Sequence, residues 1–219
     1  IWNAVEQEFE KNYEESFNLL LNYSSVSPNA TKEIMEFDIP FLIEIIDKHL
    51  NKDSFEHCRY VQDQIRWCKR NAVSHSSFTS LASKFTNHTY ETFLKVDWNM
   101  HRDKEMFEFS KFDEYDKLKE DEIRSSFVFK NSNEVIEFYS IFVYLKNIAK
   151  NDWGYGKTLE YVIDENLIQN FELGFRLLIE IIKNNNVINY VPRIVFRNHL
   201  NTIERTDKIW NIIQNGGNN

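Results

Sequence analysis

Apolar side chains recur every three or four positions along most of this chain, which is the spacing of one face of an α-helix. In the first segment these side chains are Val5, Phe9, Tyr13, Phe17, Leu20 and Leu21. The chain has only 5 Gly and 3 Pro in 219 residues, which leaves little turn chemistry for an all-β sandwich or barrel. The sequence therefore predicts an all-α fold.

Breaks in the pattern place the individual helices. The first is expected over about residues 2–23 and ends before Ser27-Pro28-Asn29. A short helix through Met35 should follow, and Asp38 can then cap a third, with Pro40 in its first turn. Later helices are expected near residues 54–69, 134–149, 171–183 and 202–213, and the charge-rich stretch 103–124 should be a solvated helix face.

Short helices joined by turns, roughly eight to eleven of them, are typical of stacked helical hairpins rather than of one four-helix bundle. No fixed repeat period is visible, so we expect an irregular, α-solenoid-like array. No Pro/Ser-rich linker divides the chain, which predicts one array over residues 1–219 with a flexible end at 215–219. Because the chain opens on Ile1-Trp2 without Met, we expect an excerpt of a longer polypeptide.

The net charge of the chain restricts the kinds of molecule that it can be expected to bind. The chain carries 26 Lys and Arg against 34 Asp and Glu, a net charge of −8, which argues against a general binder of nucleic acid or of anionic membranes. It has no run of about 18 apolar residues that could span a membrane. These features predict a cytoplasmic protein that does not bind membranes.

Cysteine and histidine spacing gives no sign of a metal or cofactor. Cys58 and Cys68 would lie about 15 Å apart along one helix, too far for a disulfide, and are expected as reduced, buried thiols. The six histidines are scattered, at positions His49, His57, His75, His88, His101 and His199. We therefore expect no metal site and no cofactor.

One segment imitates a phosphate-binding loop. Gly156-Lys157-Thr158 has the ending of such a loop, and the run from Tyr161 to Glu165 imitates the acidic strand that holds magnesium. The loop lacks the Gly required where Asn151 stands, and helix is predicted where a strand should precede it. The sequence thus favours a turn between helices over a nucleotide site.

The hexapeptide Arg70-Asn71-Ala72-Val73-Ser74-His75 resembles the Arg-Asn-x-x-x-His motif of HEPN ribonucleases, which are helical bundles that cleave RNA without a metal. The resemblance implies that His75 acts as general acid and base, that Arg70 stabilises charge on the phosphate and that Asn71 orients both. It also implies a dimer with His75 facing a shared cleft. An imidazole can gain and lose a proton near neutral pH, and a guanidinium can bind a phosphate with two donors at once, so both groups suit these roles.

The arginines before this motif allow two interpretations. Arg59, Arg66 and Arg70 would line one helical face and could guide RNA. Asp63 lies four residues from Arg59 and three from Arg66, where it would form ordinary exposed ion pairs instead. A solvated helix end, with Arg70 and His75 favouring the helix dipole, is the simpler explanation of the hexapeptide.

The last ninety residues or so are similar in texture to the C-terminal helical-repeat arms of bacterial STAND NTPases, large regulatory ATPases that include antiviral sensors. The matching stretches are Ser132 to Phe138, Phe171 to Leu178, Tyr190-Val191-Pro192 and Ile209-Trp210. The nucleotide-binding core of that family is missing from this chain. The resemblance therefore implies only the role of an arm, which binds a protein ligand and restrains or releases an oligomer.

Two hypotheses follow. The first is a non-enzymatic helical recognition or scaffold module of a bacterial cytosolic protein, with a role in antiviral defence, that binds a protein ligand or the rest of its own polypeptide. Its binding residues cannot be named from sequence. The alternative is a HEPN-like endoribonuclease that uses Arg70, Asn71 and His75, with RNA as substrate and a homo-oligomer as the active form.

Overall fold

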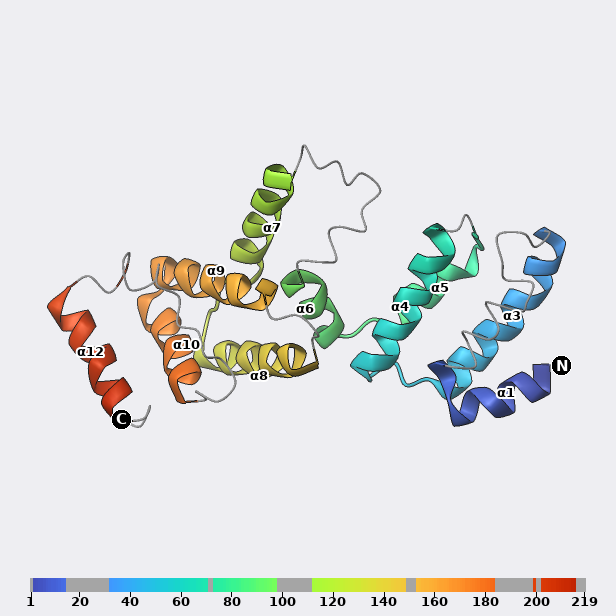
Figure 1. Cartoon of the computed structure of the whole chain (residues 1–219), viewed down its shortest axis with the longest axis horizontal. Helices are drawn as coiled ribbons and strands as arrows, with labels where there is room; N and C mark the ends of the chain where they lie inside the picture. The colour runs from blue at the N-terminus through green and yellow to red at the C-terminus, as the bar shows by residue number, and fades with distance from the viewer. Residues whose placement is uncertain are drawn as a thin grey trace. The chain divides into compact units, whose positions relative to one another are not determined.

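The computed structural model describes residues 2–14, 32–70, 73–97, 112–148, 153–183, 199 and 202–215, and the regular structure in these ranges is helical, without a strand (Figure 1). The helices are α1 (Trp2–Lys11), α3 (Lys32–His49), α4 (Phe55–Arg70), α5 (Ser77–Lys84), α6 (His88–Val96), α7 (Phe112–Ser126), α8 (Ser132–Ile148), α9 (Trp153–Gln169), α10 (Phe171–Lys183) and α12 (Ile203–Gln214). The predicted all-α fold is confirmed.

Contacts between residues divide the chain into two compact units, residues Ile1–Glu91 (unit 1) and Thr92–Asn219 (unit 2). The division falls inside α6, whose first turn belongs to unit 1 and whose last turn belongs to unit 2. One continuous helical array over residues 1–219 stays a prediction.

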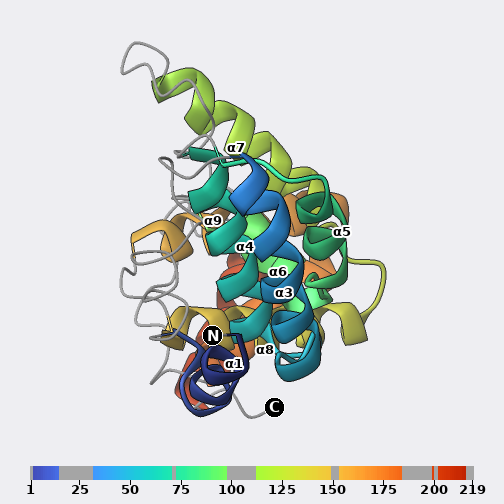
Figure 2. The ribbon, with the colours of Figure 1, turned by 90° about the vertical axis from the view of Figure 1, so that its right-hand side faces the viewer.

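Unit 1 is built from two packed pairs, α1 with α3 and α4 with α5. Figure 2 shows α3 in the foreground, with α4, α5 and α1 around it. The inward face of α4 is the one that the apolar spacing predicts, because it buries Phe55, Cys58, Val61, Ile65 and Cys68. Both thiols are free, and burial raises the pKa of each to about 11.

Helix α3 corrects one prediction. A short helix ending near Met35 and a new one capped by Asp38 were expected, but α3 runs without a break from Lys32 to His49 with Pro40 inside it. Pro40 has no N–H to donate to the carbonyl of Glu36, one turn earlier. The helix continues because its inner face stays apolar on both sides of Pro40, through Ile39, Leu42, Ile45 and Ile46, all 5% exposed or less.

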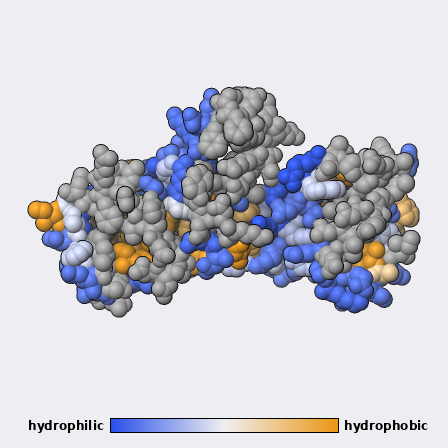
Figure 3. Space-filling view, in the orientation of Figure 1, coloured by the Kyte–Doolittle hydropathy of each residue, from blue (hydrophilic) through white to orange (hydrophobic). Residues whose placement is uncertain are grey.

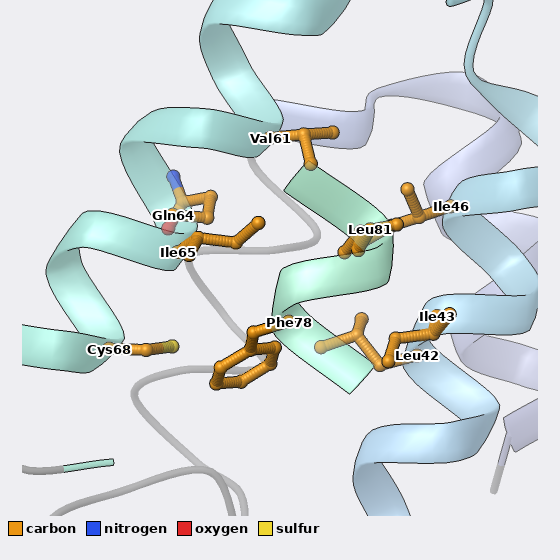
Figure 4. Close-up of a pocket in the computed structure, with 9 residues that line it drawn as sticks. All are labelled: Leu42, Ile43, Ile46, Val61, Gln64, Ile65, Cys68, Phe78 and Leu81. Atoms are coloured by element: carbon orange, nitrogen blue, oxygen red, sulfur yellow. The ribbon is translucent and has the colours of Figure 1, made fainter. Parts of the chain in front are cut away.

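A small void lies between α3, α4 and α5. Its volume is about 20 Å³, and it is lined by Leu42, Ile43, Ile46, Val61, Gln64, Ile65, Cys68, Phe78 and Leu81 (Figure 4). A space of this size holds at most one water molecule, which would need several polar partners in a lining that is almost entirely hydrocarbon. The void is therefore a packing defect and not a ligand site.

Unit 2 is centred on α9 and α10. Helix α10 packs against both α9 and α8, and α7 packs against α9. The side chains between these helices are almost completely buried and include Val135, Phe142, Leu145, Leu159, Val162, Ile163, Leu177, Leu178 and Ile181, each 1% exposed or less. Helices near 134–149, 171–183 and 202–213 were predicted, and α8, α10 and α12 match them.

A one-residue corner joins α9 to α10. The backbone N–H of Asn170 donates to the carbonyl of Asn166, and the carbonyl of Asn170 accepts from Leu173 and Gly174, so Asn170 ends one helix and starts the next. Gly174 then faces α9 with its backbone. A Cβ at Gly174 would meet Leu167 and the carbonyl carbon of Asn166 at less than 3 Å. The missing side chain allows the two helices to touch.

Buried polar side chains fix the loops of unit 2 to its helices. Asn166 is fully buried, accepts the N–H of Phe129 at 2.8 Å and donates to the carbonyls of Phe127 and Val162 at 2.6 and 2.8 Å. Thr158 and Lys119, also buried, donate to backbone carbonyls at the end of α6. Apart from the carbonyl of Val162, which lies within α9, the backbone groups bound in this way are at helix ends or in loops and would otherwise be buried without partners.

The first helix was expected over about residues 2–23, but α1 ends at Lys11. The remainder of that prediction beyond residue 14, the part of the charge-rich stretch before residue 112 and the flexible end at 216–219 lie outside the described residues. Among the helices that the structure does describe, none has the length and apolar character needed to cross a bilayer.

Candidate functional site

The hexapeptide from Arg70 to His75 spans the end of α4 and the loop before α5. Arg70 is the last residue of α4 and is exposed, Val73 is 1% exposed, and His75 is half-buried in the loop before α5. Asn71 lies outside the described residues. The structure thus places Arg70 and His75 on different elements, and the roles implied by the HEPN resemblance stay a prediction.

His75 contributes to the local fold. Its Nδ1 accepts the backbone N–H of Ser77 at 3.2 Å, and its ring lies 6.0 Å from the ring of Phe78. An acceptor nitrogen carries no hydrogen, so the neutral imidazole has its proton on Nε2. The side chain therefore satisfies one of the first N–H groups of α5, as a capping residue does.

The arginines of α4 form the ion pairs that the simpler interpretation predicts. The guanidinium of Arg66 hydrogen-bonds to Asp63, and that of Arg59 lies 3.8 Å from the same carboxylate. One carboxylate thus partly neutralises two of the three arginines that could have guided RNA.

The segment resembling a phosphate-binding loop is helical. Residues Gly154 to Thr158 lie in the first turns of α9, where Lys157 pairs with Asp116 of α7 at 2.9 Å and Thr158 donates to the carbonyl of Val96 at 3.1 Å. The two side chains that would contact a phosphate and its magnesium ion are therefore engaged with other parts of unit 2. These contacts favour a structural role for the segment over a nucleotide site, and the turn predicted over it is wrong for residues 153–158, which are helical.

Unit 2 contains a polar network that the sequence did not reveal. Nη1 of Arg124 on α7 donates to Asp164 on α9 at 2.7 Å, and Nε of Arg124 donates to Glu120 at 2.9 Å. Nε2 of His199 donates to the other oxygen of Asp164 at 2.6 Å. The guanidinium of Arg124 also stacks over the ring of Tyr161, 4.9 Å from its centroid.

The electrostatics of this network are those of a structural ion pair. Burial opposes the charge of Arg124, but its hydrogen bonds to Asp164 and Glu120 outweigh burial and raise the guanidinium pKa. Burial and the neighbouring Asp164 raise the pKa of Glu160. Both oxygens of Asp164 already accept a hydrogen bond, so this carboxylate holds its neighbours in place and does not present a base to a substrate.

No sequence signal could have found this network, because Arg124 and Asp164 are 40 residues apart and only the packing of α7 on α9 brings them together. Within the described ranges, no three His, Cys, Asp or Glu side chains are grouped in a way that could hold a metal ion.

Three aromatic rings gather on α1 and α3 of unit 1, two of them exposed and one half-buried. Phe37 is 65% exposed and Phe41 38% exposed, and their ring centroids are 5.4 Å apart. Trp2 of α1 stacks on Phe41 at 5.7 Å, with an angle of 13° between the rings. We call Trp2, Phe37 and Phe41 the aromatic face. Figure 3 shows hydrophobic surface bordering hydrophilic surface where α1 and α3 lie.

The aromatic face is held in position by several contacts between α1 and α3. The indole N–H of Trp2 donates to Asp38 at 3.3 Å. Further along both helices, Glu6 accepts from Lys48 at 2.5 Å and from His49 at 2.8 Å, and these hydrogen bonds lower the pKa of Glu6. The three rings therefore have a defined arrangement before anything binds them.

The aromatic face was not predicted, although part of its signal is present in the sequence. Phe37 and Phe41 lie four residues apart, but α3 also has aliphatic residues on its inner face, and the spacing does not say which apolar residues point outward.

Comparison of the chain with protein-family models, with curated proteins and with solved structures finds no match.

Proposed function

We propose that this chain is a non-enzymatic helical recognition module that binds a protein ligand. The carrying observation is the aromatic face, where Phe37 is 65% exposed and lies in ring contact with Phe41. Exposing large aromatic side chains next to one another is costly in water, and such groups are enriched at the centres of protein interfaces.

The setting that we propose is a bacterial cytosolic protein of antiviral defence, in which the chain serves as the ligand-binding arm of a larger assembly. The similarity of residues 132–138 and 171–178 to the arms of STAND NTPases supports this setting. The acidic balance of the chain supports a protein ligand over RNA. Recognition and scaffolding by stacked helices need no cofactor.

The test is site-specific photo-crosslinking. A benzophenone amino acid replaces Phe37 in one variant and Leu118 in a matched variant, because Leu118 is equally exposed, at 66%, and is the one exposed large apolar residue among the described side chains of α7. In bacterial cells we expect a discrete crosslinked protein from position 37 and none from position 118. That protein, purified, should bind the wild-type chain and bind Phe37→Ser at least about tenfold more weakly.

Two outcomes contradict the proposal. One is that no purified protein crosslinked from position 37 binds the chain in a Phe37-dependent way. The other is metal-independent RNA cleavage by the purified wild-type chain that is lost in Arg70→Ala and in His75→Ala, which would establish the ribonuclease instead.

A further inference from the structure

The outer face of α3 combines aromatic and acidic side chains at helical spacing. Phe37, Pro40 and Phe41 are exposed, Glu33 precedes Phe37 by four residues, and Glu44 follows Phe41 by three. Residues three and four apart are neighbours on a helix surface. An apolar strip a little more than one helical turn long is thus bordered by a carboxylate at each end.

The two helices that carry the aromatic face are acidic. Helices α1 and α3 together contain eight carboxylates and three lysines, a net charge of −5, against −8 for the whole chain. Two of these lysines pair with Glu8 and Glu6 of α1, away from Phe37 and Phe41. The field at the aromatic face therefore attracts cations and repels anions.

The rings of the aromatic face are ready to bind a partner. Trp2 is fixed at both ends of its side chain, by the stacking on Phe41 and by the hydrogen bond to Asp38. Rings that are already ordered lose little rotational freedom on binding, so more of the buried apolar area contributes to affinity.

From these observations we infer that the aromatic face binds a cationic amphipathic helix of the protein ligand, with aliphatic side chains on the rings and Lys or Arg beside Glu33, Glu36 and Glu44. This inference rests on the proposed function and names the partner surface. A helix that repeats apolar anchors every three or four residues matches a strip of this length. Opposite charges at its edges set the orientation and speed the encounter.

The same charges exclude other occupants. Nucleic acid and anionic lipid would bring negative charge against the carboxylates of α1 and α3. A second copy of the chain, seated face to face, would oppose those same carboxylates with their equivalents. Only a cationic partner gains from both the rings and the charges.

The probe is a fluorescently labelled Leu/Lys peptide about 14 residues long, the length of an ordinary helix, with a control peptide in which Glu replaces every Lys. Fluorescence anisotropy measures binding of each peptide to the whole chain. We expect the Lys peptide to bind and the Glu peptide not to bind. Phe37→Ser and Phe41→Ser should each weaken binding at least about tenfold, and Glu33→Gln combined with Glu44→Gln should reduce its salt dependence.

Matched controls separate this face from general attraction to an acidic protein. Ile203→Ser and Trp210→Ser remove exposed apolar side chains from α12, 83% and 58% exposed, and should leave the affinity unchanged. Equal binding to the wild type and to Phe37→Ser would overturn the inference, and so would equal losses in the α12 variants. Sedimentation of the wild type beside Phe37→Ser tests whether the chain associates with itself through this face. A wild-type dimer that Phe37→Ser dissociates would also overturn the inference.

The result is independent of the crosslinking test. If the crosslinked protein binds through Phe37 but the Lys peptide does not bind, or if the docking segment of that protein is acidic, the proposed function stands and this inference fails. If no Phe37-dependent protein ligand exists, the proposed function itself fails.

Discussion

The backbone of Gly174 touches the backbone of Leu167, since a Cβ added to Gly174 would lie 2.5 Å from the amide nitrogen of Leu167. Both residues belong to rigid helices that meet at a one-residue corner, so neither backbone can move aside cheaply. This contact fixes how closely α9 and α10 pack, and the rest of the unit 2 core is arranged around that pair.

Gly174→Ala should destabilise unit 2 by about 2 to 4 kcal/mol, although alanine is the better helix former, because the new methyl group forces the helices apart. Urea unfolding followed by circular dichroism measures the loss. Ser140→Ala, on the exposed side of α8, is the control and should change little. A Gly174→Ala variant as stable as the wild type would show that the helices separate without cost.

Asn166→Ala should cost about 3 to 5 kcal/mol, because it removes three hydrogen bonds and leaves the N–H of Phe129 and the carbonyl of Phe127 buried without a partner. Asn166→Asp keeps the acceptor and loses both donors, so it should also be destabilised, and more so at neutral pH, where the buried carboxyl is charged. The loss of stability relative to the wild type should therefore be smaller at pH 4, which is near the ordinary pKa of an aspartate, than at pH 7, which is well above it. An equal loss at the two pH values would refute this account.

Glu160→Gln should raise the stability of unit 2 at neutral pH. Burial raises the pKa of Glu160 in the folded chain, so the folded state holds this proton more tightly than the unfolded state does. Ionisation of Glu160 therefore opposes folding once the pH is above the folded-state pKa. Thermal unfolding should give Glu160→Gln a higher midpoint than the wild type at pH 7, with the difference disappearing below about pH 4, where the glutamate is protonated in both states. A difference that persists in acid would contradict the electrostatic cause.

Val61→Ile should stabilise unit 1 by about 0.5 to 1 kcal/mol, because one more methylene can enter the void between α3, α4 and α5. Val135→Ile provides the comparison, since Val135 is equally buried in α8 but does not line this void, and the larger side chain should destabilise there. Chemical denaturation measures the free energy of unfolding of both variants. If both lose stability, the void cannot accept the added group.

The wild-type chain, Arg70→Ala and His75→Ala should all leave a mixed-sequence RNA pool intact in the absence of metal. His75→Ala should nevertheless lose about 0.5 to 1 kcal/mol of stability, because the N–H of Ser77 loses its acceptor. Gel analysis of the RNA and urea unfolding of the three proteins give both readouts. Cleavage to 2′,3′-cyclic phosphate ends by the wild type, and by neither Arg70→Ala nor His75→Ala, would establish that the chain is a ribonuclease.

The sequence predicted those parts of the fold that depend on local periodicity. The buried face of α4 and the ranges of α8, α10 and α12 follow from apolar spacing, and the pairing of Asp63 with Arg59 and Arg66 follows from positions three and four apart on a helix. Predictions failed where tertiary packing overrode a local signal. Pro40 lies inside α3 because the apolar face continues past it, and the glycines before Lys157 lie in α9.

The candidate surfaces were harder to predict for a different reason. The aromatic face needs Trp2 of α1 beside Phe41 of α3, and the network of unit 2 needs Arg124 of α7 beside Asp164 of α9. Each pair is tens of residues apart in sequence. Periodicity describes one helix at a time and carries no information about which helices become neighbours.

The two thiols of unit 1 provide a probe that the chain carries already. Cys58 and Cys68 are its only cysteines, both are buried, and unit 2 has none. An alkylating reagent can reach them only when α4 separates from its neighbours, so the rate of labelling under native conditions reports how often unit 1 opens. The exchange of amide hydrogens in α9 and α10 reports unit 2. Comparing the two rates would show whether the halves of this molecule unfold as one cooperative body or as two.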